Sequence, residues 1–248
     1  MGGHSHWKGI KEKKGAADAK RGKLFAKLLR AIEVSARQGD PNPENNPTLA
    51  DAIQRAKDAS MPKDNIDRAI KRASGDLAGE NWERTFYEGY GAGGVAMLCD
   101  ALTNNRNRTS QDLRAIFRKH NGNLAEPGAV QWLFDRKGVI IVDKSAALED
   151  DVMTAALDGG ADDVRAEESE LEIVTDPSAF GDVKAALEKA GIPILSAEIT
   201  MVPQNTVPVD GSDARAVLKL MEALEDHDDV QNVYANFDIP EAVLAEVG

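Results

Sequence analysis

The spacing of apolar residues changes near residue 80, which limits the chain to a helical segment followed by mixed α and β structure. In residues 15–38 a 3.6-residue helical period is set by Leu24, Phe25, Leu28, Leu29, Ile32 and Ala36. Two shorter helices are expected at 47–60 and 62–73, the second with Pro62 in its first turn. The polar linker SGDLAGEN then closes an all-helical segment.

Beyond the linker the apolar residues alternate with the period of two that is typical of strands. The first block reads as two strands joined by GAGG, a helix and a further strand, at 85–90, 95–102, 110–120 and 131–136. Residues 138–203 then give strand, helix, strand, strand, helix and strand, which is the order of the ferredoxin-like βαββαβ unit. A helix at 212–225 and a strand at 230–237 remain.

These last two elements are too few to enclose a core, while residues 84–136 lack a second helix and an edge strand. Each segment therefore completes the other, and we expect an α+β protein with one domain inserted in another. The expected divisions are a basic helical nucleic-acid-binding domain at 1–79, a split α+β domain at 80–137 plus 204–248, and an inserted ferredoxin-like domain at 138–203.

Charge is distributed unevenly along the chain. The net charge is -12, yet residues 1–75 carry 16 Lys and Arg against 9 Asp and Glu, whereas residues 144–248 carry 6 against 24. A basic head with an acidic tail is expected when one end of a protein meets a polyanion and the other end stays off it. Two solvated surfaces of opposite sign are the alternative, which charge counts alone leave open.

The first helix carries a row of cations that we call the basic rail. At 100° per residue one sector, nearly opposite the apolar face, contains Lys20, Lys23, Lys27, Arg30 and Arg37. Upstream lie further cations and an aromatic residue: Trp7, Lys8, Lys11, Lys13 and Lys14. Lysine and arginine neutralise phosphates, and an aromatic side chain can stack on a base. We therefore predict a nucleic-acid contact here, the alternative being an ordinary solvated helix face behind a polar tail.

Two arginines outside the head are further candidates. Arg106 and Arg108 lie in the loop NNRNRTS, close to the start of the helix expected at 110–120. Cations at a helix N-terminus oppose the helix dipole, so a phosphate or RNA partner is one explanation of their position. A polar loop without a partner is the other, and replacement of surface loop residues should cost within about 0.5 kcal/mol.

Two other features are expected to be structural. Cys99 is the single cysteine and lies in the apolar run GVAMLCDAL, where a thiol behaves as a small buried hydrophobe. The segment YEGYGAGG resembles a phosphate-binding loop only superficially, because it joins two strands and lacks the Lys-Ser/Thr pair and the following helix. A tight hairpin is the expected structure.

No arrangement typical of catalysis or of a metal site is recognisable. His4 and His6 lack a cysteine or histidine partner nearby, so neither metal nor cofactor is expected. The acidic run of Glu225, Asp226, Asp228 and Asp229 lacks calcium-loop spacing and is interpreted as a solvated helix end. We expect a non-enzymatic protein.

No membrane partner is expected either. The chain has no run of about 18 apolar residues, and its first 14 residues contain charges but no apolar core of the kind a signal peptide needs. The expected location is therefore the cytoplasm.

Several segments together resemble the YebC/PmpR family over nearly the full chain. They are GHSHWKGIKEKKGAADAKRGKLFAKLLRAIEV, NPTLADAIQRAKDASMPKDNIDRAIKR, YEGYGAGGVAMLCDALTNNRNRT, GGADDV and DDVQNVYANF. The resemblance implies a helical head plus two α+β domains. It also implies a DNA-binding transcriptional regulator, or a translational activator acting at the ribosome. His6 stands where the family commonly has lysine, which removes a permanent cation, and Ala92 stands where proline is common.

The leading hypothesis is a DNA-binding regulator whose basic head contacts the phosphate backbone while its acidic domains engage another protein or present the segment NNRNRT. The alternative is a translation factor that uses the same head on ribosomal RNA, since phosphate is common to both polymers. An enzyme using the acidic clusters ranks third. No helix carries the Arg, Asn and Gln pattern of a base-reading element, so strong sequence specificity is not expected.

Overall fold

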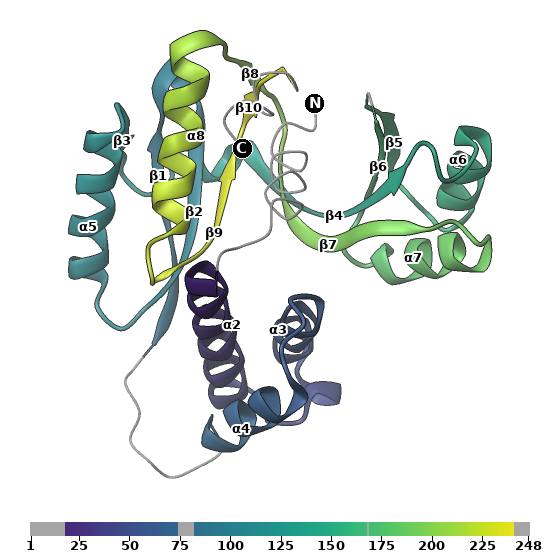
Figure 1. The fold of residues 1–248 in the computed structure, drawn as a ribbon, viewed down its shortest axis with the longest axis horizontal. Helices are drawn as coiled ribbons and strands as arrows, with labels where there is room; N and C mark the ends of the chain where they lie inside the picture. Colours follow the sequence, from purple (N-terminus) through teal and green to yellow (C-terminus); the bar gives the residue numbers. More distant parts are fainter. Residues whose placement is uncertain (1–17, 74–81, 168, 241–248) are drawn as a thin grey trace.

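The computed structural model describes residues 18–73, 82–167 and 169–240, with side chains from residue 21 onward. We call residues 18–73 the head and residues 82–240 the body (Figure 1). The head consists of α2 (Asp18–Gln38), the short 3-10 helix η1 (Pro43–Asn45), α3 (Pro47–Asp58) and α4 (Lys63–Ala73). Its core is formed by the apolar faces of the three α-helices and includes Leu28, Ile32, Leu49, Ile53, Ile66 and Ala69. The helical segment predicted from the sequence is confirmed.

Asn46 fixes the corner between α2 and α3. It is buried, and its side-chain oxygen accepts a hydrogen bond from the backbone N–H of Leu49 at 3.1 Å, which caps the first turn of α3. Its side-chain amide donates to the carbonyl oxygens of Ser35 and Asp40, both at 2.9 Å. The end of one helix and the start of the next are therefore joined by a single side chain.

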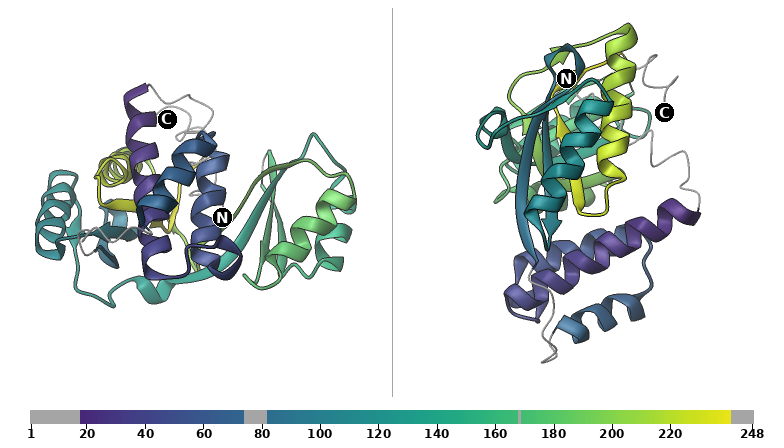
Figure 2. Two further views of the ribbon diagram at one scale, coloured as in Figure 1. Left: turned by 90° about the horizontal axis from the view of Figure 1, so that it is seen from below. Right: turned by 90° about the vertical axis from the view of Figure 1, so that its left-hand side faces the viewer.

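The first sheet of the body combines strands from both ends of the body sequence. It contains β1 (Glu83–Tyr90), β2 (Ala96–Thr103), β3 (Asn123–Leu124) and β9 (Val230–Ala235) in the order β3-β1-β2-β9, and all neighbours are antiparallel. Helices α5 (Arg106–Lys119) and α8 (Gly211–Glu225) cover one face of this sheet (Figures 1 and 2).

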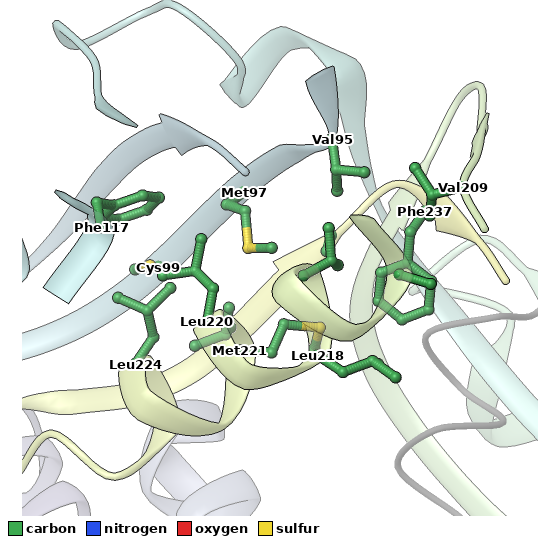
Figure 3. Close-up of a cluster of buried hydrophobic side chains, with 14 of the residues drawn as sticks. Val95, Met97, Cys99, Phe117, Val209, Leu218, Leu220, Met221, Leu224 and Phe237 are labelled. Carbon is green, nitrogen blue, oxygen red and sulfur yellow. The ribbon is translucent and has the colours of Figure 1, made fainter. Parts of the chain in front are cut away.

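Apolar side chains from β2, α5, α8 and the C-terminal strands meet beneath these helices. Figure 3 shows Met97 and Cys99 opposite Leu220 and Leu224, with Phe117 from α5 at the edge of the cluster. Burial raises the pKa of the Cys99 thiol, which therefore stays protonated and acts as a core residue, as predicted. The β1–β2 connection is also the predicted hairpin, with Gly93 and Gly94 at φ values of 67° and 78° that favour glycine.

The second sheet has the ferredoxin-like arrangement predicted for its segment. Its elements are β4 (Phe134–Asp143), α6 (Glu149–Asp158), β5 (Asp163–Ala166), β6 (Glu170–Thr175), α7 (Phe180–Lys189) and β7 (Ile194–Pro203). The strands lie in the order β5-β6-β4-β7 and pair antiparallel. The two helices pack on one face over a core that includes Ile140, Leu171, Ile173, Val183 and Leu187.

The prediction of a strand of the first sheet at 131–136 is wrong. Residues Gln131–Leu133 form the 3-10 helix η3, and Phe134 begins the long strand β4 of the second sheet. The reason is pairing: β4 is in register with β7 from Phe134 opposite Pro203, so this segment is already part of the second sheet. A strand of two residues, β3, forms the edge of the first sheet instead.

The strand expected at 230–237 is interrupted at Asn236. This residue is buried, and its side-chain oxygen accepts a hydrogen bond from the backbone N–H of Ala96 at 2.7 Å. After it, β10 (Phe237–Asp238) pairs in parallel with β8 (Val207–Pro208), a short strand that the sequence did not indicate.

The two sheets are nested in sequence, because the strands of the second sheet all lie between β3 and β9 of the first. The division of the chain into three independent domains stays a prediction. None of the described helices is long and apolar enough to cross a membrane.

Candidate nucleic-acid interface

The contact residues predicted for the head and the segment before it fall into three groups. Trp7, Lys8, Lys11, Lys13 and Lys14 lie outside the described residues, as do His4 and His6. Lys20 lies on α2, but its side chain is also outside what is described. On the rest of the rail, Lys23 and Arg37 are exposed, whereas Lys27 and Arg30 are half-buried.

Lys27 contacts the body rather than solvent. Its ammonium group donates a hydrogen bond to the carbonyl oxygen of Glu225, the last residue of α8. The final carbonyl groups of a helix have no partner within the helix and carry partial negative charge, so they attract a cation. Burial lowers the pKa of Lys27 to about 8, although the nearby carboxylates of Glu225, Asp228 and Asp226 act in the opposite direction.

Arg30 makes a second contact to the same turn of the body. Its guanidinium donates to the carbonyl oxygen of Asp228 at 3.0 Å and lies 3.4 Å from the Asp229 carboxylate. It also lies over the Trp82 ring, 4.2 Å from the ring centroid, where a cation is attracted to the aromatic face. The side chain of Arg30 remains 27% exposed.

Asp229 is the centre of this contact. Its side chain is only 5% exposed, and it accepts hydrogen bonds from the guanidinium of Arg108 at 2.8 Å and the hydroxyl of Thr109 at 2.7 Å. Burial alone would raise the pKa of the Asp229 carboxyl, but the hydrogen bonds from Arg108 and Thr109 hold it below its ordinary value. We call Lys27, Arg30, Arg108, Thr109 and Asp229 the Asp229 cluster.

The acidic run was predicted to be a solvated helix end, and for Asp229 this is wrong. Asp226 and Asp228 are exposed as expected, but Asp229 is buried in the turn just before β9. The physical reason is that a guanidinium from each side compensates its charge, which permits burial.

The two arginines outside the head belong to α5 itself, which begins at Arg106 rather than at residue 110. The Asn105 side chain caps this helix by accepting a hydrogen bond from the backbone N–H of Arg108 at 3.1 Å. Arg106 is 60% exposed, donates to the Thr85 hydroxyl at 3.1 Å and lies 3.8 Å from the Glu83 carboxylate.

Arg108 differs from Arg106 because it compensates a buried carboxylate. Its side chain is 48% exposed, yet its replacement would leave Asp229 with one cation fewer. The small stability cost expected from the sequence therefore applies to Arg106 and not to Arg108.

A third cation of the head, Arg55 on α3, contacts the body beside this cluster. Its guanidinium donates to the side-chain oxygen of Asn232 at 2.9 Å, and the Asn232 amide lies 3.3 Å from the Asp100 carboxylate. Asp100 is buried on β2 and accepts two hydrogen bonds from Arg84, at 2.8 and 2.6 Å. The joint between head and body thus consists of charged and polar contacts.

Sequence reasoning missed Arg55, Asp100 and Asp229. A signal was available for Asp100, because a carboxylate inside the apolar run VAMLCDAL needs a buried partner. No comparable signal exists for Arg55, whose partner is 177 residues away.

Other described cations of the head are exposed to solvent. They are Arg21, Lys23, Arg37, Lys57, Lys63, Arg68, Lys71 and Arg72. No group of His, Cys, Asp and Glu side chains that could hold a metal ion occurs among the residues that the structure describes. Ion pairing and phosphate contact are the chemistry these cations offer.

Replacing Asp229 with asparagine should destabilise the protein by about 2 kcal/mol at pH 7, because Arg30 and Arg108 lose a buried counter-charge. The folded state depresses this pKa, so the contribution is present above the unfolded-state pKa of about 3.9 and is lost as pH falls through the lower folded value. Urea unfolding of the parent and D229N at pH 7 and pH 3 measures both effects. The exposed neighbour provides the control, D228N, which should stay within about 0.5 kcal/mol of the parent. Equal costs for both variants would contradict the cluster's role.

The lowered pKa of Lys27 predicts that the protein becomes more stable as the pH rises above 8. The folded state binds its proton less tightly than the unfolded chain, so the free energy of unfolding should rise as pH increases from about 8 toward 10.5. Relative to Lys27→Met, the parent should gain about 2 kcal/mol between pH 7 and pH 9.5, at about 1.4 kcal/mol per pKa unit. The exposed residue Lys57, changed to Met, is the control and should retain the parent's profile. Parallel profiles for the parent and Lys27→Met would show that Lys27 is not buried against α8.

Comparisons with known proteins place this geometry in a family. Residues 5–76 match the model of the TACO1/YebC protein N-terminal domain, and residues 82–237 match that of the TACO1/YebC second and third domain. A "Probable transcriptional regulatory protein" of Geobacter sulfurreducens is 55% identical over 239 residues, 96% of each chain. One of the same name from Dictyoglomus turgidum is 51% identical over 245 residues, 98% of each chain. The crystal structure of a conserved hypothetical protein from Aquifex aeolicus is similar, with a TM-score of 0.77 and 50% identity, covering 90% of this chain and 92% of that one. The chain therefore belongs to the TACO1/YebC family.

Proposed function

We propose that the protein is a nucleic-acid-binding regulator whose head contacts the phosphate backbone, with duplex DNA as the leading target. The observation that carries this proposal is the set of exposed cations on the described part of the head, apart from the cations that bind the body. The names of its relatives, which describe probable transcriptional regulatory proteins, support a regulatory role. Catalysis is not part of the proposal.

The contacts within the protein divide the rail into two parts. Lys27 and Arg30 hold the body, so their charge is already compensated by the turn at 225–229. Lys20 and Lys23 lie earlier on α2, and Lys23 is exposed. We therefore assign phosphate contact to this earlier part, together with the lysines that precede α2 in the sequence.

Contacts of this kind position a protein on nucleic acid without reading its sequence. The affinity should therefore be similar for unrelated sequences and should fall steeply with salt, because each neutralised phosphate releases counterions. The acidic C-terminal part of the chain, with 24 Asp and Glu in residues 144–248, is left for a protein partner.

Changing Lys20 and Lys23 to glutamine should weaken binding to unrelated duplexes equally and make the log-log salt slope shallower by about 2, at about 0.9 per phosphate. Filter binding of the full chain at several salt concentrations measures this slope. The control changes Lys184 and Lys189 of α7, which removes the same charge from the body. An unchanged slope, or an equal effect in the control, would contradict phosphate contact by the rail.

Ribosomal RNA is the second candidate target, and the observation that favours it is the exposure of Arg106 on the body. This arginine is 60% exposed and lies on the body two residues before a residue of the Asp229 cluster, so it offers a second contact beyond the head. Irregular RNA presents phosphates and stacking surfaces on several sides, whereas a duplex can be held by the head alone.

Arg106→Gln should reduce cosedimentation with ribosomes and leave DNA retention unchanged if RNA is the target. The variant should fold normally, because an exposed ion pair contributes little to stability. Arg114→Gln, an exposed position on the same helix, is the control. Loss of DNA retention with ribosome binding intact would contradict this use of Arg106.

A further inference from the structure

An open concavity lies on the head between α2 and α4. Its volume is about 560 Å3, and it is lined by Leu29, Asn65, Arg68, Lys71 and Arg72. Every charged residue of this lining is a cation. The lining surface is mainly apolar, so the concavity suits a ligand whose nonpolar portion enters it while an anionic group meets the guanidinium and ammonium groups.

The residues that the structure describes compensate only part of the positive charge of the concavity. Arg68 donates to the carbonyl oxygen of Asp64 at 3.1 Å and to the side-chain oxygen of Asn65, both neutral acceptors that orient the guanidinium and leave its charge in place. Arg72 pairs with Glu33 at 2.8 Å. Lys71 is exposed and forms no ion pair with a described residue.

The spacing of these cations favours a multivalent anion. Positions 68, 71 and 72 are related by three and four residues, which places neighbouring side chains on one side of a helix with Cβ atoms about 5–6 Å apart. Asp64 and Asp67 are also exposed on α4, but neither lines the concavity. A guanidinium presents paired N–H groups that match phosphate oxygens, while the lysine adds a point charge.

The location of the concavity separates it from the acidic body. In both Figure 1 and the right-hand view of Figure 2, α4 lies on the far side of α2 from α8 and β9. Lys27, Arg30 and Arg55 lie on the near side, because all three contact the body. A polyanion can therefore approach α4 without meeting the acidic turn at 225–229, and repulsion between exposed charges fades over about 8 Å in physiological salt.

We propose that this concavity, formed by Arg68, Lys71 and Arg72 beside Leu29, is a binding site for nucleic-acid backbone phosphate on the head. The site rests on the proposed function and deepens it, because it adds residues that lie outside the rail. Phosphate contact then extends from the start of α2 to the outer side of α4. The sugar next to a bound phosphate packs against Leu29.

The test is binding of duplex DNA by the full chain with Arg68 and Lys71 both changed to glutamine. The loss of two phosphate contacts should make the salt slope shallower by about 2 and lower the affinity roughly 30-fold near 0.15 M salt. Neither side chain pairs with a carboxylate of a described residue, so the melting temperature should stay close to that of the parent. The single variant K71Q should give half of this change in the salt slope. It tests the site even if the double variant unfolds.

The control changes Lys57 and Lys63 to glutamine, which removes two exposed cations of the head that do not line the concavity. If R68Q/K71Q binds DNA with the affinity of the parent while the Lys20 and Lys23 variant binds more weakly, the proposed site at the concavity would be overturned. The proposed function would remain intact. Failure of the parent to bind any nucleic acid would overturn both. Poly-glutamate serves as the competitor that represents an acidic protein. If it displaces DNA from the parent at equal charge concentration, and if R68Q/K71Q no longer binds it, the phosphate site would be overturned in favour of an acidic protein partner.

Discussion

The buried carboxylate of Asp229 joins the head to the body. A carboxylate removed from water needs opposite charge and hydrogen bonds, and Asp229 obtains them from Arg108 and Thr109 of α5 and from Arg30 of α2. The body alone therefore compensates only part of the negative charge of Asp229. Lys27 strengthens the joint by donating to the last carbonyl of α8. The long helix α2 is thus held across the end of the first sheet by charge, whereas the head and the body each have a separate apolar core.

This joint divides the cations of the head by their use. Those directed toward the body are compensated by the acidic turn at 225–229 and by Asn232, so a nucleic acid would have to displace those groups to reach them. The cations on α4, and Lys23 near the start of α2, remain exposed. The same basic composition therefore serves both internal assembly and the proposed contact with phosphate.

The sequence predicts most of the fold because burial on one face leaves a periodic pattern. The helices of the head and the βαββαβ order of residues 138–203 follow from that pattern alone. The strand at 131–136 could not be assigned to a sheet, because its apolar residues suit either one and only the pairing with β7 decides. The Asp229 cluster could not be predicted for a related reason. Arg30 and Asp229 are 199 residues apart, and helical spacing shows that a cation is exposed on its own helix without showing which other element covers it.

The most direct test follows the arginine side chains of the full chain during titration with duplex DNA, using their Nε–H signals in nuclear magnetic resonance spectra. Arg68 and Arg72 are proposed to contact phosphate, whereas Arg30 and Arg108 are held by Asp229. Binding should therefore shift the signals of Arg68 and Arg72 and leave those of Arg30 and Arg108 in place. Shifts confined to Arg30 and Arg108 would contradict the account, since they would mean that nucleic acid displaces Asp229 and binds at the joint.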